Sequence, residues 1–147
     1  MKKLLFCIMA LATLVVVGCE KEDDNYSTDF SGMWAGVGYY EDGDRESYDL
    51  VEEVLSFEKG YVKSYVIRNY SGYTFKNGYL DCLRSDLYAS TTFEIELHKD
   101  KCYMYDCPPG YSREEVGYLK IKGDKMYWYD DVNSYEIYER IKGFTED

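Results

Sequence analysis

The sequence contains a single histidine, His98, and few of the residue patterns on which common enzymes depend. His98 alternates with Glu94 and Glu96 in a predicted strand, so we expect an exposed strand residue rather than a catalytic base. The sequence has no Gly-x-Ser-x-Gly motif and no phosphate-binding glycine loop. Glu41, Asp42 and Asp44 are acidic, but the segment lacks the later glutamate of an EF-hand, and a hairpin turn is expected over residues 41–44. We therefore predict a non-enzyme that has no metal site and no cofactor.

Positive charge is also scarce, because 17 Lys and Arg stand against 28 Asp and Glu, a net charge of −11. Removal of residues 1–18 would take away Lys2 and Lys3 but no acidic residue, which changes the net charge to −13. Such a surface repels nucleic acid and attracts basic proteins. We expect no nucleic-acid partner.

Long apolar runs are absent except for residues 4–17, which are fewer than the roughly 20 that a spanning helix needs. Lys2 and Lys3 precede this run, and Val-Val-Gly-Cys19 closes it. A basic start, a short apolar core and a small residue before a processing site predict a signal peptide over residues 1–18, which is removed. The Val-Val-Gly-Cys segment resembles the lipobox of bacterial lipoproteins. The alternative is an ordinary cleaved signal followed by an incidental cysteine.

The lipobox resemblance implies that Cys19 is acylated and becomes the new N-terminus, so its acyl chains would anchor the protein in a membrane. The charged residues after it predict a flexible tether over residues 19–30. These residues also resemble the surface-export tag of some Gram-negative lipoproteins, through Lys21, Glu22, Asp23 and Asp24. The expected location is the outer membrane of a Gram-negative bacterium, with the protein exposed on the cell surface.

Alternation of polar and apolar residues with a period of two predicts an all-β domain over residues 31–147. In the clearest run, Phe93, Ile95 and Leu97 share one face of a strand. Tight-turn signals separate the runs, and loop composition marks residues 107–115. The strands are predicted near residues 33–41, 49–58, 61–69, 73–76, 79–84, 90–98, 101–106, 116–122, 125–130 and 134–141, with a short helical turn near 84–88. Eight to ten strands of this kind predict an antiparallel up-and-down meander that closes into a barrel, with a β-sandwich as the alternative.

Three cysteines follow Cys19, and export to an oxidising compartment would permit a disulfide between two of them. Cys102 can pair with Cys82 on a neighbouring strand or with Cys107 across a short segment, and the sequence does not choose between the two. The 18 tyrosines are mostly expected as half-buried strand residues.

Three residues carry a resemblance to the calycins, the group that includes lipocalins and fatty-acid-binding proteins. Gly32 and Trp34 form a Gly-x-Trp motif on the first predicted strand, and Arg140 lies on the last. The resemblance implies that Arg140 lies across the Trp34 indole and closes one end of a lipocalin-like barrel, where a cation–π contact stabilises it. On this reading the three residues are structural. The chain departs from the family in ending soon after Ile141, without the usual helix.

These observations predict a binding protein. The barrel and its aromatic residues favour a small apolar or amphipathic ligand, although the residues that bind it cannot be named from the sequence. The alternative is a protein-interaction module, such as an inhibitor or a subunit of a surface complex with a basic partner. For that alternative, residues 107–115 are the candidate contact.

Overall fold

The computed structural model describes residues 26–67, 71–131 and 133–146. Nearly all regular structure in these residues is β-strand. The strands are β1 (Tyr26–Ser27), β2 (Gly32–Glu41), β3 (Asp44–Ser47), β4 (Glu53–Glu58), β5 (Tyr61–Ile67), β6 (Phe75–Lys76), β7 (Tyr79–Leu80), β8 (Leu87–His98), β9 (Lys101–Asp106), β10 (Glu114–Lys122), β11 (Lys125–Asp131), β12 (Ser134–Arg140) and β13 (Gly143–Phe144). In this part of the chain, no helix has the length and apolar character needed to cross a membrane.

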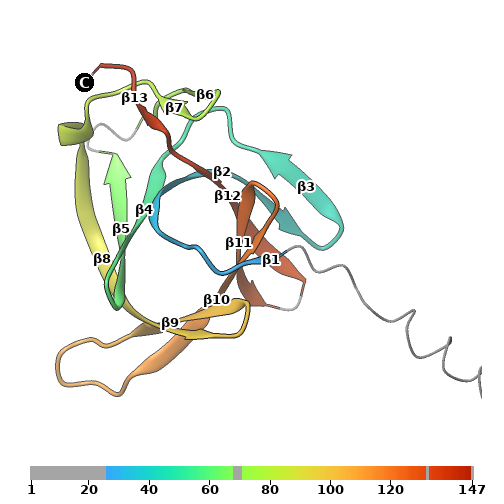
Figure 1. Ribbon diagram of the computed structural model, residues 1–147, viewed down its shortest axis with the longest axis vertical. Coiled ribbons are helices and arrows are strands. Elements are labelled where there is room, and N and C mark those ends of the chain that lie inside the picture. The colour runs from blue at the N-terminus through green and yellow to red at the C-terminus, as the bar shows by residue number, and fades with distance from the viewer. Residues whose placement is uncertain (1–25, 68–70, 132, 147) are drawn as a thin grey trace, which may run out of the picture.

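Eight strands form a closed antiparallel barrel in the order β2-β4-β5-β8-β9-β10-β11-β12, and β12 pairs with β2 to complete the ring (Figure 1). Each strand pairs antiparallel with the next barrel strand along the chain. Tight turns make some of these connections, as between β4 and β5, whereas a longer segment that carries β6, β7 and η2 connects β5 to β8. The predicted all-β meander that closes into a barrel is therefore confirmed, and the β-sandwich alternative is not. Closure leaves these eight strands with no free edge.

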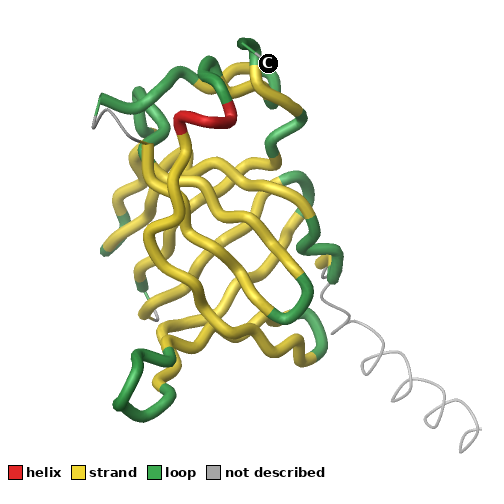
Figure 2. The backbone as a smooth tube through the Cα atoms, turned by 90° about the vertical axis from the view of Figure 1, so that its left-hand side faces the viewer, coloured by secondary structure: helices red, strands yellow, loops and turns green. Residues whose placement is uncertain are grey.

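The remaining strands lie outside the ring. β3 folds back onto the end of β2 through a turn at Asp42 and Gly43, both of which have positive φ. The two-residue β1 pairs with the end of β10. β6, β7 and β13 form a separate sheet, in which β13 runs parallel to β7. This small sheet and the 3₁₀ helix η2 (Arg84–Asp86) form a layer along one side of the barrel, at the top of Figure 2.

Successive side chains of a strand point to opposite sides of the barrel wall, and the apolar ones form two clusters, one on each side. Trp34 points into the barrel and packs in the first cluster with residues from the other strands, including Leu55, Met104 and Leu119. Its neighbour Ala35 points outward into the second cluster. That cluster lies between the outer wall and the small side sheet, and its members are Ala35, Val51, Val54, Ile67, Leu80, Cys82 and Leu87.

The main differences from the predicted elements lie at strand ends and in short outer strands. β3 was not predicted, and residues 49–52 precede β4 instead of belonging to it. β8 starts at Leu87, inside the predicted helical turn, because only residues 84–86 adopt the 3₁₀ conformation. The packed chain also begins before the predicted boundary at residue 31, since β1 pairs with β10 and Phe30 is buried in the barrel cluster.

Candidate functional site

One end of the barrel is closed by the chain that leads into β2, which crosses the ring of strands in Figure 1. Phe30 packs into the barrel cluster, and the Trp34 indole nitrogen donates a hydrogen bond to the Phe30 carbonyl at 3.1 Å. Arg140 donates to the carbonyls of Ser31 at 2.5 Å and Asp29 at 2.9 Å. Its guanidinium carbon lies 4.2 Å from the centre of the Trp34 ring. The structure thus brings Arg140 and Trp34 together at the end of the barrel that this segment covers.

Gly32 stands at the start of β2 with a φ of +92°, a conformation that favours glycine. A β-carbon there would lie 3.6 Å from the Arg140 guanidinium, which is an ordinary contact. The positive φ, rather than lack of space, is therefore what this position requires of its residue.

The inside of the barrel is filled by side chains. The largest fully buried residues include Trp34, Tyr138, Leu55, Met104 and Met126, and all of them belong to the interior cluster. An eight-stranded barrel is narrow enough for its own side chains to fill it. A ligand of ordinary size therefore has to be sought at the rim or on the outer wall.

A hydrogen-bonded cluster of polar side chains lies in the barrel wall around Glu53. Ser64 donates a hydrogen bond to the Glu53 carboxylate at 3.2 Å, and the Tyr138 hydroxyl is a further partner of that carboxylate. Burial raises the pKa of Glu53 above its ordinary value, these hydrogen bonds oppose the rise, and the charge of Glu136 adds to it. Burial also raises the pKa of Glu136, while a hydrogen bond of 2.8 Å from the Tyr48 hydroxyl lowers it. These hydrogen bonds hold the side chains in place, and Tyr48 at the outer end also lines a groove on the outer wall.

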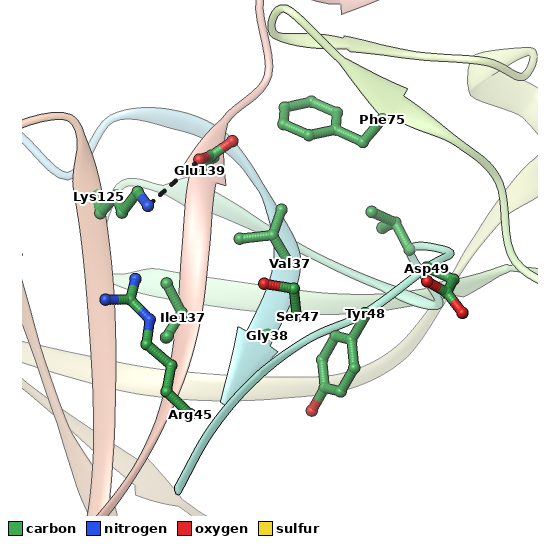
Figure 3. Close-up of a pocket in the computed structure, with 11 residues that line it drawn as sticks. Val37, Gly38, Arg45, Ser47, Tyr48, Asp49, Phe75, Lys125, Ile137 and Glu139 are labelled. Carbon is green, nitrogen blue, oxygen red and sulfur yellow. Dashed lines mark ion pairs between the residues drawn. The ribbon is translucent and has the colours of Figure 1, made fainter. Parts of the chain in front are cut away.

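A groove on the outer wall, between β3, β6 and β12, combines apolar walls with two cationic side chains and is the candidate site (Figure 3). Its volume is about 230 Å³. Val37, Ile137 and Phe75 supply apolar walls. The guanidinium of Arg45 and the ammonium of Lys125 lie on the same side of the groove, beside Ile137, in Figure 3.

The two cations of the groove differ in their surroundings. Lys125 Nζ lies 3.7 Å from a carboxylate oxygen of Glu139, which directly faces it across β11 and β12. Arg45 is exposed on β3, opposite Tyr40. Ser47 and Asp49 add polar groups at the other side. The arrangement can hold an anionic group beside an apolar wall.

Close contact between β3 and β2 forms the groove, and Gly38 permits it. A β-carbon at Gly38 would collide with the carbonyl oxygen of Glu46 on β3. Tyr48 N donates to the Val37 carbonyl at 2.9 Å and continues the pairing beyond β3. Sequence reasoning did not find Arg45, because the residues of β3 are all exposed and show no alternation. The one available signal was Asp42-Gly43, a dipeptide that favours a tight hairpin.

The cysteines do not form the disulfide considered for Cys102. Cys102 is buried in the interior cluster, whereas Cys82 lies in the cluster outside the wall and Cys107 is exposed beyond the end of β9. A disulfide needs Cα atoms within about 7 Å, and five residues of extended chain span roughly 16 Å. Neither pairing is therefore present. Burial raises the pKa of the Cys102 thiol to about 12, so the sulfur stays protonated.

Several predicted features lie outside the described residues. These are the signal peptide over residues 1–18, the acylated Cys19, and the export-tag residues Lys21, Glu22, Asp23 and Asp24. Among the residues that the structure does describe, no three His, Cys, Asp or Glu side chains are grouped to hold a metal ion. His98 is exposed at the end of β8.

No protein-family model matches the chain, and no curated protein matches it. Among solved structures, a lipocalin-like protein from Bacteroides uniformis is similar, with 16% identity over 77% of this chain and 99% of that chain, and a TM-score of 0.47. The fold assignment rests on the strand pairing described above.

Proposed function

We propose that this protein is a lipid-anchored cell-surface binding protein that takes a small amphipathic ligand with an anionic group. The observation that carries the proposal is the groove beside β3, where Arg45 and Lys125 border an apolar wall in a chain whose net charge is strongly negative. The anionic group would lie between these two cations, and the apolar part would lie against Val37, Ile137 and Phe75. Binding on the outer wall fits a barrel whose interior is already filled.

The size of the groove limits the ligand. At about 230 Å³ it is smaller than the roughly 300–1,000 Å³ of typical small-molecule sites. Arg45 offers a planar fork of donors that suits a carboxylate or phosphate. Lys125 is paired with the Glu139 carboxylate and therefore contributes less to the binding of an anion. A short acyl chain with one acidic group therefore matches the groove in size and charge.

The anchor is the second part of the proposal and rests on Cys19 and the lipobox. The chain enters the described fold at β1, which pairs with the end of β10.

Octanoate is a suitable probe, with octanol and octylamine as neutral and cationic probes of the same chain length. We expect calorimetry on the full-length protein in detergent to detect octanoate binding that Arg45→Gln weakens by about five- to tenfold, because a charge-assisted hydrogen bond is lost. Lys122→Gln removes an exposed cation outside the groove and should change affinity by less than about twofold. Equal octanoate affinity in the parent and Arg45→Gln proteins would exclude this site.

A further inference from the structure

The outer wall carries a row of five tyrosines that face one another on five adjacent strands. In order they are Tyr103 on β9, Tyr118 on β10, Tyr129 on β11, Tyr135 on β12 and Tyr40 on β2. Successive ring centres lie 5.8, 5.1, 5.1 and 4.9 Å apart. Each tyrosine is partly exposed, while residues beside it in the same strands, such as Leu119 and Met104, point into the barrel. We name this set the tyrosine row.

The tyrosine row forms a long, nearly continuous surface. Four strand spacings of about 4.8 Å give it a length of roughly 19 Å, which matches about six residues of extended chain. Cross-strand aromatic pairs stabilise sheets by themselves, which explains why the rings touch. Tyrosine also supplies rigid contact area at low entropic cost, and it is enriched at protein interfaces.

An acidic pocket of about 560 Å³ adjoins the row at the ends of β10 and β11. Two row members, Tyr118 and Tyr129, line it together with Glu114, Glu115 and Asp130. The lining includes no lysine or arginine. The pocket thus combines aromatic faces with negative charge, which is the combination that attracts a cation.

Two cationic side chains of the protein itself make cation–π contacts with tyrosine rings on this wall. Lys101 Nζ lies 4.6 Å from the centre of the Tyr118 ring. The Arg113 guanidinium carbon lies 3.6 Å from the centre of the Tyr105 ring, next to the row on β9. These contacts show that a cationic side chain can lie against these rings, and they indicate the chemistry that an incoming partner would use.

We propose that the tyrosine row and its acidic pocket dock an extended, basic segment of a partner protein. Lysine or arginine side chains of the segment lie against the tyrosines and reach the carboxylates of Glu114, Glu115 and Asp130, and its backbone follows the row. The surface differs from the groove beside β3, so the proposal is independent of the small-ligand function. A second copy of this chain is a poor occupant, because its net charge is also strongly negative.

The test uses full-length protein in detergent and a nine-residue peptide of alternating arginine and serine, titrated by calorimetry. We expect binding that Tyr118→Leu weakens roughly three- to fivefold through loss of cation–π contact. The triple change Glu114→Gln, Glu115→Gln and Asp130→Asn should weaken it about tenfold. A matched triple, Glu52→Gln, Asp124→Asn and Glu146→Gln, removes three exposed carboxylates elsewhere and should change affinity by less than about twofold.

A gain of affinity gives a test that a folding defect cannot imitate. Lys101→Gln frees the Tyr118 ring for the incoming cation, so the peptide should bind roughly two- to threefold more tightly. Lys76→Gln removes an exposed charge on the side sheet and should have a smaller effect. An equal loss of peptide affinity in both triple variants would overturn the proposal, because it would show unspecific charge attraction. Failure of the peptide to bind would also overturn it, as would cellohexaose binding that Tyr118→Leu abolishes.

Discussion

At the scale of single residues, Glu53 brings a carboxylate into the wall of the barrel beside the buried Ser64. Its carboxylate accepts a hydrogen bond from Ser64 and lies near Glu136. Burial raises its pKa above 4.5 in the folded state. The folded protein therefore holds this proton to higher pH than the unfolded chain does, and the stabilising contribution of the protonated form is lost as pH rises through the folded pKa.

Glu53→Gln should thus stabilise the fold at neutral pH, because the amide keeps an oxygen for the hydroxyl donors and carries no charge. We expect the free energy of unfolding at pH 7 to rise by about 1 kcal/mol, and the difference from the parent to vanish below about pH 4. Urea unfolding at a series of pH values measures both. Glu52→Gln, at the exposed neighbouring position, should stay within about 0.5 kcal/mol of the parent at every pH. A pH-independent effect of Glu53→Gln would show that ionisation is not involved.

Residues also show how far the sequence could be interpreted. Trp34 lies near the start of the domain and Arg140 near its end. Their contact was predicted from the resemblance to calycins, and the structure shows it. Arg45 could not be found, because exposed residues such as those of β3 leave no periodic pattern. The tyrosine row was hidden for another reason. Each tyrosine fits its own strand, but their alignment depends on register across five strands, and a bulge at Val37 changes that register.

At the scale of elements, β3 is the piece on which the groove depends. Gly38→Ala would place a methyl group against the Glu46 carbonyl, so β3 has to move away from β2. We expect amide hydrogens of β3 to exchange about tenfold faster in this variant, and octanoate binding to weaken, while the barrel strands keep their protection. Hydrogen exchange followed by mass spectrometry measures this.

Gly36→Ala is the matched control, since it adds the same methyl group two residues earlier in β2. There the nearest atoms, the Glu53 carbonyl oxygen and the Tyr138 ring, would lie 3.5 Å away, an ordinary contact. Exchange at β3 should remain that of the parent. Protection of β3 in Gly38→Ala equal to that in Gly36→Ala would show that close contact at Gly38 does not hold this strand.

At the scale of the whole molecule, the proposed anchor is separate from the barrel and can be tested without it. Cys19→Ser removes the thiol that would accept the acyl chains. We expect incorporation of a labelled fatty acid to fall to background, while the barrel residues Gly32, Trp34 and Arg140 are unaffected. A protein that stays uncleaved can remain on the membrane through its signal peptide, so acyl label rather than membrane fractionation is the measurement. Undiminished labelling of Cys19→Ser would exclude the lipobox interpretation.

The way the chain enters the barrel also decides how the molecule responds to force. A pull on Tyr26 first reaches β10, through the two-residue pairing of β1, and that short pairing would separate first. Tension would then pass to the carbonyls of Asp29 and Ser31, both held by Arg140 at the end of β12. The force is therefore shared between the first barrel strand and the last, which are hydrogen-bonded to each other along their length. A pulling force on the entering chain therefore acts on β2 and β12 in the same direction and does not separate these two strands.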